Sequence, residues 1–192
     1  MNEIIYNGKI IERKNFKKDY IRLTVLSRNG DNTYVSFLCE PHKIDKIPEG
    51  TQRVNIKGHL ESHSEKFNGK YVLRQHYYVD EIEASKTILE DKFGIKGKYY
   101  EYPSSSVYIK GKVKALTKDG DWDRYTILTD ETGESKSYSI VASRRNTGKK
   151  KSDISEGDNI CCVCMIATPQ KIINNKKVHY EDLLISDIAK VN

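Results

Sequence analysis

The stretch from Arg53 to Ala84 constrains the fold most, because it reads as two strands joined at Asn68-Gly69. Apolar and polar residues alternate from Val54 to Leu60, which is the period of a half-buried strand. They alternate again from Tyr71 to Val79. Asn-Gly is a strong hairpin signal because both residues accept positive φ. The stretch therefore predicts a long antiparallel β-hairpin.

Three short sequence words follow one another in this hairpin. They are Ile56-Lys57-Gly58-His59-Leu60, a basic loop that ends in Asn68-Gly69-Lys70-Tyr71, and Val79-Asp80-Glu81-Ile82. Together they resemble the last hairpin of bacterial single-stranded DNA-binding proteins. The resemblance implies an OB fold, and it implies DNA contacts on the basic and aromatic hairpin loop.

Three more strands and a short helix are expected before the hairpin. Alternation is present in Ile4–Ile11, in Tyr20–Leu26 and in Thr33–Cys39. Pro41–Ile47 fits a short helix, and turn residues separate the strands. Together with the hairpin this gives five strands with a helix between the third and the fourth, which is the order of the OB barrel.

The same pattern then begins again. Gly111 takes the place of Gly8, 103 residues later (111 − 8), and Gly157 follows Gly50 by 107 residues (157 − 50). This near-constant offset predicts duplication of one module and excludes a short solenoid period. Further strands are expected at Val107–Val113, Trp122–Thr129, Ser137–Ala142 (matching Tyr34–Cys39), Asn159–Pro169 and Val178–Ile188, with Asn174–Lys177 as a hairpin tip.

We therefore predict an all-β chain with two tandem five-stranded OB-fold barrels and short helices between strands 3 and 4. The expected boundaries are 1–92 for the first barrel, 93–106 for a linker and 107–192 for the second barrel. The second barrel departs from the family pattern, because Met165-Ile166 stands where Gly58 is expected. Its assignment therefore rests on the internal repeat.

Composition sets wide limits on the partner. The 192 residues include 33 Lys+Arg and 27 Asp+Glu, a net charge of +6. This excess fits a polyanionic partner, but an AT-rich genome gives a Lys-, Ile- and Asn-rich chain without any selection for binding. No apolar run has the length of a membrane span, and the N-terminus lacks signal-peptide features. We therefore expect a cytoplasmic protein.

The cysteines and histidines give no sign of a metal site or of catalysis. Cys161, Cys162 and Cys164 share one strand-like run, and neighbouring strand residues face opposite sides, so these thiols do not converge on one metal. With Cys39 they are predicted to be buried and reduced. Nucleotide-binding, hydrolase and metalloprotease motifs are absent. We predict no cofactor and no enzyme activity, and a metal-dependent nuclease stays as an alternative.

Binding of a single strand needs cations that follow the phosphates and rings that stack on bases. On an OB barrel these residues belong on the outer face of strands 2 and 3 and on the loops 1–2 and 4–5. The predicted nucleic-acid-binding residues of the first barrel are Tyr20, Arg22, Tyr34, Lys57, Lys66, Phe67 and Lys70. Those of the second are Lys112, Trp122, Arg124, Arg144, Arg145, Lys149, Lys150, Lys151, Lys176 and Lys177.

Several of these residues have a structural alternative. Trp122 fits base stacking or a cap on the barrel end, and Tyr20 and Tyr34 fit stacking or packing. The basic run from Arg144 to Lys151, expected as a loop after strand 3, fits phosphate contact or a solvated loop. Phe37 and Tyr125 alternate with apolar residues, so we assign them to the core.

The sequence thus predicts binding of single-stranded DNA with little sequence specificity, in DNA replication, recombination or mobile-element transfer. Replication or conjugation proteins are candidate further partners, no membrane is involved, and a monomer or a homodimer is expected. The fold leaves two alternatives open. These are a primosome-type protein-interaction module without DNA affinity of its own, and a single-stranded RNA-binding protein.

Overall fold

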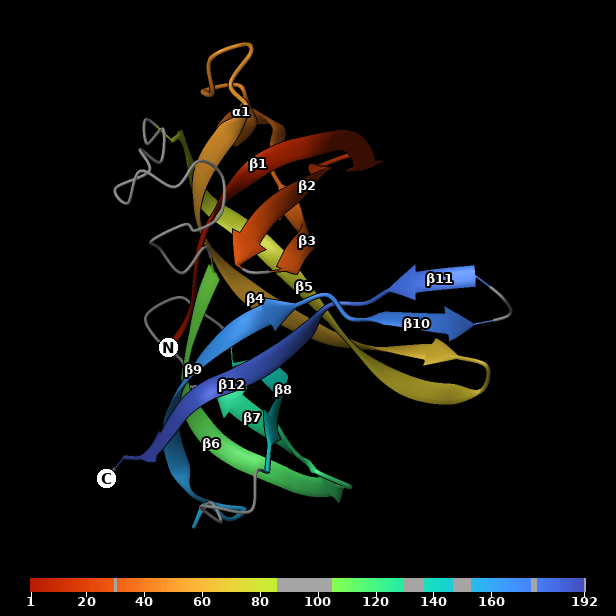
Figure 1. Ribbon diagram of the computed structural model, residues 1–192, viewed down its shortest axis with the longest axis vertical. Coiled ribbons are helices and arrows are strands. Elements are labelled where there is room, and N and C mark those ends of the chain that lie inside the picture. Colours follow the sequence, from red (N-terminus) through yellow and green to blue (C-terminus); the bar gives the residue numbers. More distant parts are fainter. Residues whose placement is uncertain (30, 86–104, 130–136, 147–152, 174–175, 192) are drawn as a thin grey trace. The chain divides into compact units, whose positions relative to one another are not determined.

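The computed structural model describes residues 1–29, 31–85, 105–129, 137–146, 153–173 and 176–191. These residues form strands and one short helix, α1 (Pro41–Ile44), so the predicted all-β class is confirmed (Figure 1). Contacts divide the chain into two compact units. Unit 1 comprises Met1–Glu3, Leu60–His76 and Val107–Asn192, and unit 2 comprises Ile4–His59 and Tyr77–Ser106.

The first five strands close into a barrel. They are β1 (Asn2–Lys17), β2 (Tyr20–Asn29), β3 (Asp31–Cys39), β4 (Arg53–Phe67) and β5 (Lys70–Ala84). β1 pairs with β2 and β4, β2 with β3, β3 with β5, and β5 with β4. The circuit of pairings is closed, and α1 lies between β3 and β4 as predicted, which is the strand order of an OB-like barrel.

The inner face of this barrel holds the apolar residues that alternate along the strands. The ring of Phe37 packs against those of Tyr6 and Tyr77, with centroid distances of 5.1 and 6.0 Å. All three are buried, which confirms that Phe37 belongs to the core. The Tyr6 hydroxyl lies 3.3 Å from the Val25 carbonyl and 3.2 Å from the Thr33 carbonyl, so this buried polar group has acceptors.

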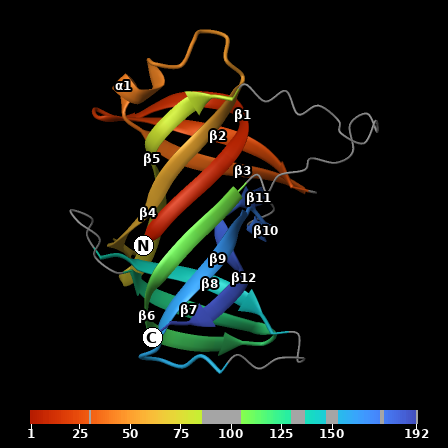
Figure 2. The same cartoon turned by 90° about the vertical axis from the view of Figure 1, so that its left-hand side faces the viewer.

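The second half repeats the order of strand pairing. Its strands are β6 (Ser105–Asp119), β7 (Trp122–Thr129), β8 (Ser139–Arg145), β9 (Asn159–Ala167) and β12 (Asp182–Lys190). β6 pairs with β7 and β9, β7 with β8, β8 with β12, and β12 with β9. Figure 2 shows β6, β9 and β12 side by side. Tyr125 is buried, as are Ile109, Ile127, Ile140 and Ile160 of the same half, and its assignment to the core is confirmed.

The two hairpins differ. The predicted turn of the first is confirmed, with positive φ at Asn68 (48°) and Gly69 (78°), as a tight two-residue turn requires. In the second, a separate ribbon of β10 (Gln170–Ile173) and β11 (Lys176–His179) interrupts the path from β9 to β12. The predicted fourth strand, Asn159–Pro169, agrees closely with β9, whereas the prediction of one fifth strand over Val178–Ile188 is wrong, because that stretch is divided between β11 and β12. Pro169 has no N–H to continue a ladder, and its carbonyl accepts the Tyr180 N–H at 3.3 Å.

Two glycines allow the first strand of each half to pass close to the second. A Cβ at Gly8 would lie 2.5 Å from the Leu26 carbonyl oxygen, and one at Gly111 would lie 2.1 Å from that of Leu128. Real Cβ atoms do not approach backbone oxygens so closely, so both positions require glycine. The predicted match between the two glycines therefore holds at the level of strand contact.

The register also places Trp122 where Tyr20 stands. β1 shifts register between Ile10 and Glu12, and β6 shifts between Val113 and Ala115, the same distance after each glycine. The two strands then run into the tight turn that leads to β2 or β7. Tyr20 pairs with Lys17, and Trp122 pairs with Asp119.

Two other predicted matches between the halves are wrong, that of Ala142 with Cys39 and that of Met165-Ile166 with Gly58. Leu23 pairs with Phe37, and Tyr125 pairs with Ala142, so Ala142 matches Phe37 and not Cys39. β2 ends at Asn29 and β3 begins at Asp31, whereas β7 ends at Thr129 and β8 begins only at Ser139. A constant offset in sequence does not account for this longer connection.

Gly58 has a different counterpart from the one expected. Gly58 pairs with Ile4 of β1, and Cys164 pairs with Val107 of β6. Cys164, and not Met165-Ile166, therefore stands where the first half has Gly58. Part of the expected second helix region, 147–152, lies outside the described residues, and residues 146 and 153–158 form no helix.

The predicted domain boundaries at 92 and 107 stay a prediction, since residues 86–104 lie outside the described part of the chain. The contacts add a detail that the sequence did not indicate. The outer part of the first hairpin, Leu60–His76, belongs to the same compact unit as Val107–Asn192.

All four cysteines are free thiols. Cys39, Cys162 and Cys164 are buried as predicted, whereas Cys161 is half-buried. Burial raises the pKa of Cys39 to about 11. The pKa of Cys164 is also raised, through its contact with Cys162 and through burial. These protonated thiols act as small apolar side chains.

Candidate nucleic-acid interface

In unit 2 the outer face of the barrel carries rings and a cation on neighbouring strands. Leu23 and Val25 of β2 are buried inside the barrel, and alternation turns Tyr20 and Arg22 to the opposite face. Both are half-buried. The structure thus brings these two predicted residues together on the outer face.

Phe16 and Tyr78, which the sequence reasoning missed, make ring contacts with this pair. The Arg22 guanidinium lies over the Phe16 ring, 4.3 Å from its centroid, as a cation–π contact. The Tyr20 ring meets the Tyr78 ring edge-on at 5.6 Å. Tyr78 follows the buried Tyr77 on β5, so alternation was the signal that would have found it.

His59 of β4 completes the group. Its ring is stacked on Tyr78 with a centroid distance of 5.5 Å and an interplanar angle of 12°. Its Nδ1 lies 2.8 Å from an Asp80 carboxylate oxygen. We call Phe16, Tyr20, Arg22, His59 and Tyr78 the outer-face cluster.

An apolar residue lies beneath this cluster. Leu38 of β3 pairs in register with Arg22 on one side and with Tyr78 on the other. Alternation with Phe37 and Cys39 puts Leu38 on the outer face, yet it is only 5% exposed. The outer face is therefore packed at this point, and the rings of the cluster are held in place.

Lys57 and Tyr34 stand elsewhere on the same barrel. Lys57 is exposed, and its Nζ lies 3.3 Å from a Glu81 carboxylate oxygen. Such exposed pairs stabilise a protein little, so a phosphate group can replace the carboxylate. Tyr34 is 36% exposed on β3, paired in register with Leu26.

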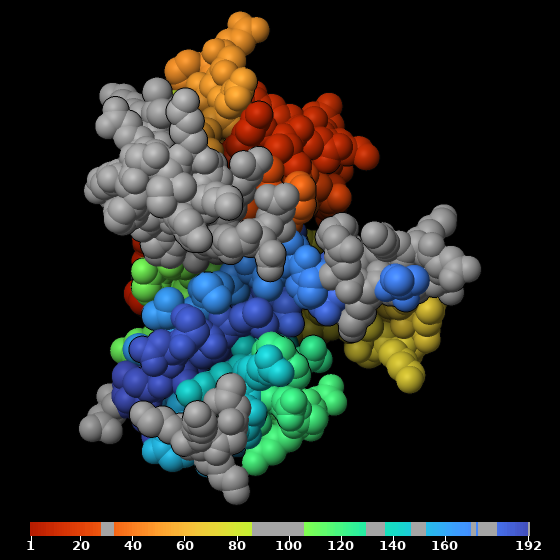
Figure 3. All heavy atoms as spheres, viewed as in Figure 1, coloured from red at the N-terminus to blue at the C-terminus, as the bar shows by residue number. Residues whose placement is uncertain are grey.

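In unit 1 the tip of the β4–β5 hairpin, the yellow projection in Figure 3, exposes Lys66, Phe67 and Lys70. Phe67 is 53% exposed, with the Arg74 guanidinium 5.7 Å from its ring centroid. The Arg74 Nε also donates a hydrogen bond to Glu65 Oε1 at 2.6 Å, and this bond lowers the pKa of that carboxyl. Tyr71, another residue that the sequence reasoning missed, is 78% exposed.

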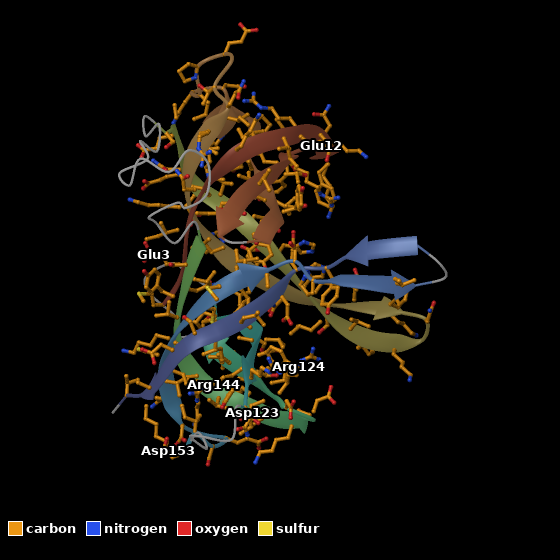
Figure 4. All side chains as sticks on the ribbon, viewed as in Figure 1. Glu3, Glu12, Asp123, Arg124, Arg144 and Asp153 are labelled. Carbon is orange, nitrogen blue, oxygen red and sulfur yellow. The ribbon has the colours of Figure 1, made fainter. Side chains whose placement is uncertain are left out.

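The second half exposes Trp122 and Arg124 on the outer row of β7, as predicted. Trp122 is 38% exposed and pairs in register with Arg145, which is also exposed. Arg144 differs, because it pairs in register with the buried Asp123 (Figure 4). Both arginines lie in β8, so their prediction as loop residues is wrong.

The remaining candidates are dispersed. Lys112 is exposed at the middle of β6, in register with Leu128, which lies near the opposite end of β7 from Trp122. Lys176 and Lys177 begin β11 next to the connection from β10, at the end of this ribbon, and only their backbone is described. Lys149, Lys150 and Lys151 lie outside the described residues.

The part of the chain that the structure describes shows neither a metal site nor a membrane helix. No group of three or more His, Cys, Asp or Glu side chains is arranged to hold a metal ion there. Among these residues, no helix has the length and apolar character needed to cross a membrane.

Comparison with solved structures identifies the fold. The wild-type single-stranded DNA-binding protein from Thermus aquaticus superimposes with a TM-score of 0.65 at 9% identity, over 100% of this chain and 93% of that one. A deletion mutant of the same protein gives 0.65 at 10% identity, over 100% and 95%. The likeness is one of fold. No family model and no curated protein matches the sequence.

Proposed function

We propose that this protein binds single-stranded DNA with little sequence preference, without catalysing a reaction. The observation that carries the proposal is the outer-face cluster. It combines a guanidinium with four rings on the barrel face where OB folds bind oligonucleotides. Cations beside stacking rings are the two elements that single-strand binding needs. The similarity in fold to the Thermus protein supports this function.

We further propose that the chain is a tandem duplication of one OB module, with the second barrel contributing to the same activity. The matched glycines, register shifts and Tyr20/Trp122 positions support the duplication. Trp122, Arg124 and Arg145 are then the main ligand residues of the second barrel. Lys66, Phe67 and Lys70 on the first hairpin, with Lys57 and Tyr34, extend the DNA contacts of the first.

Replication, recombination or mobile-element transfer is the setting that this activity fits, with replication or conjugation proteins as further partners. The rival of a protein-interaction module without DNA affinity predicts no oligonucleotide binding at any salt concentration. The RNA rival predicts that poly-U competes better than poly-dT.

The direct test is a fluorescence titration with poly-dT, which uses Trp122 as a reporter because it is the one tryptophan of the chain. A base stacked on the indole quenches its emission. Phosphate contacts release counterions, so affinity should fall steeply between about 50 and 200 mM salt. Poly-U competition runs in parallel. An absence of binding at low salt would refute the proposal.

A further inference from the structure

The side chain of Gln75 completes a strand edge in unit 1. Its Nε2 donates to the Val141 carbonyl at 3.3 Å, and its Oε1 accepts the Val141 N–H. One carboxamide thus serves both backbone polar groups of one residue, as a neighbouring strand would. Gln75 belongs to β5 of the hairpin, and Val141 belongs to β8.

The position of Val141 on β8 explains why such a partner is needed. Residues of a strand turn their N–H and C=O groups alternately to one edge and to the other. β12 pairs with β8 at Ser143, two positions beyond Val141 and on the same edge. β12 is not paired at Val141 in the described register, so Gln75 supplies the next rung of that ladder.

Other contacts hold the three segments of unit 1 together. The Tyr138 hydroxyl donates to Glu61 at 2.9 Å, which joins the hairpin to the residue before β8. Asn2 brackets Leu60 in the way that Gln75 brackets Val141, with bonds of 2.6 and 3.0 Å. Met1 and Lys110 are joined by a backbone bond of 2.8 Å. Each segment is thus bonded to the other two.

We propose that Gln75 is a positioning residue for DNA binding: its carboxamide fixes the β4–β5 hairpin on β8 and so holds the tip residues Lys66, Phe67 and Lys70 in place. The expected effect of Gln75 on DNA affinity rests on the proposed function. A tip that is already ordered does not lose its conformational freedom when DNA binds, and an unanchored tip does. The hairpin is long and ends in an exposed turn. Gln75 lies at the end of Leu60–His76 that is away from this turn, so a contact there fixes the position of the tip.

The variant Gln75→Leu removes both hydrogen bonds and keeps a side chain of similar size. It should weaken poly-dT binding by roughly three- to tenfold, the cost of ordering a few side chains. Gln52→Leu is the matched control, because Gln52 is exposed and lies outside unit 1. Its affinity should equal that of the wild type. Tyr138→Phe, a milder change at the second anchor, replaces Gln75→Leu if that variant does not fold.

A second background separates positioning from general stability. In a tip variant with Lys66, Phe67 and Lys70 all changed to alanine, Gln75→Leu should have no further effect on affinity. An equal loss in both backgrounds, or wild-type affinity of Gln75→Leu in the intact protein, overturns the proposal.

Hydrogen exchange keeps the test independent of the proposed function. In the free protein Gln75→Leu should speed exchange at the Val141 amide and at the hairpin amides, and unchanged exchange at these amides overturns the anchor. If the wild type binds no oligonucleotide, the proposed function fails, and hydrogen exchange alone decides whether Gln75 anchors the hairpin.

Discussion

Tyr20 and Trp122 occupy the same place in the two halves of the chain, yet their surroundings differ. Each is the first residue of its strand and pairs across a tight turn with the end of the preceding strand. Tyr20 is half-buried and contacts the Tyr78 ring. Trp122 is 38% exposed, and among the described residues its indole has no ring partner.

The difference shows that two rings at the same position in the strand register are not equally accessible to a DNA base. Rings of the outer-face cluster already pack against one another and over Leu38, so a base must insert beside them or replace a neighbour. The indole of Trp122, beside Arg145, presents its surface directly. The three predictions that follow either break or sharpen this comparison.

The largest effect is expected on stability, from Gly111→Ala and Gly8→Ala. An added Cβ forces the backbone carbonyl of Leu128 or Leu26 to move, and such overpacking costs about 1–3 kcal/mol or more. The closer approach at Gly111 (2.1 against 2.5 Å) predicts the larger loss there. Denaturant unfolding measures both. The control is Lys9→Ala, at the exposed residue next to Gly8, and it should change stability little. Equal stability of all three variants would contradict the close approach of the strands.

The next effect is on affinity. Trp122→Ala should weaken poly-dT binding by about 1–3 kcal/mol, the contribution of one good base stack. Tyr20→Ala should weaken it less, because Phe16, Tyr78 and His59 remain. Trp122→Phe and Tyr20→Phe keep a ring and serve as controls. Fluorescence anisotropy of labelled poly-dT measures all four variants, and wild-type affinity in both alanine variants would remove the outer-face assignment.

The smallest effect concerns an ion pair of the second half. Lys190 lies 2.9 Å from Asp158, and their hydrogen bond lowers the pKa of Asp158. The Ser85 N–H donates to the Arg53 carbonyl, and the Val191 N–H donates to the Asn159 carbonyl in the same way. The residue before each donor therefore matches, and the first half has Ala84 where the second has Lys190.

Because the folded pKa of Asp158 lies below its unfolded value, the pair stabilises the protein above pH 4 or so. That contribution is lost as the pH falls through the folded pKa. Lys190→Met should therefore lower the melting temperature slightly at pH 7, and by less as the pH falls below about 4. Lys114→Met, a change at an exposed lysine of β6, is the control. A difference from the wild type that does not change with pH would assign the loss to packing.

Local pattern was enough to predict the parts of the fold that local physics determines. Alternation located β2, β3 and β7, and Asn68-Gly69 fixed the hairpin turn, because a residue's face and its φ depend on near neighbours. Alternation also assigned Phe37 and Tyr125 to the core and turned Tyr20, Arg22, Trp122 and Arg124 outward.

What failed depends on partners that are distant in sequence. The two-residue shift of β8 put Arg144 opposite the buried Asp123, and no spacing rule reports a register across strands. His59 and Tyr78 join the cluster only because β4, β5 and β3 meet. Gln75 shows the same limit, since its partner on β8 is 66 residues away.

The composition of the two units sets an order for synthesis. Unit 2 needs no residue beyond Ser106, whereas unit 1 joins Met1–Glu3 and Leu60–His76 to the chain from Val107 onward. As the ribosome makes the chain, unit 2 can fold first, as leading domains do. The hairpin tip, with Phe67 and Tyr71, then emerges well before β8, and it has no anchor until β8 is made.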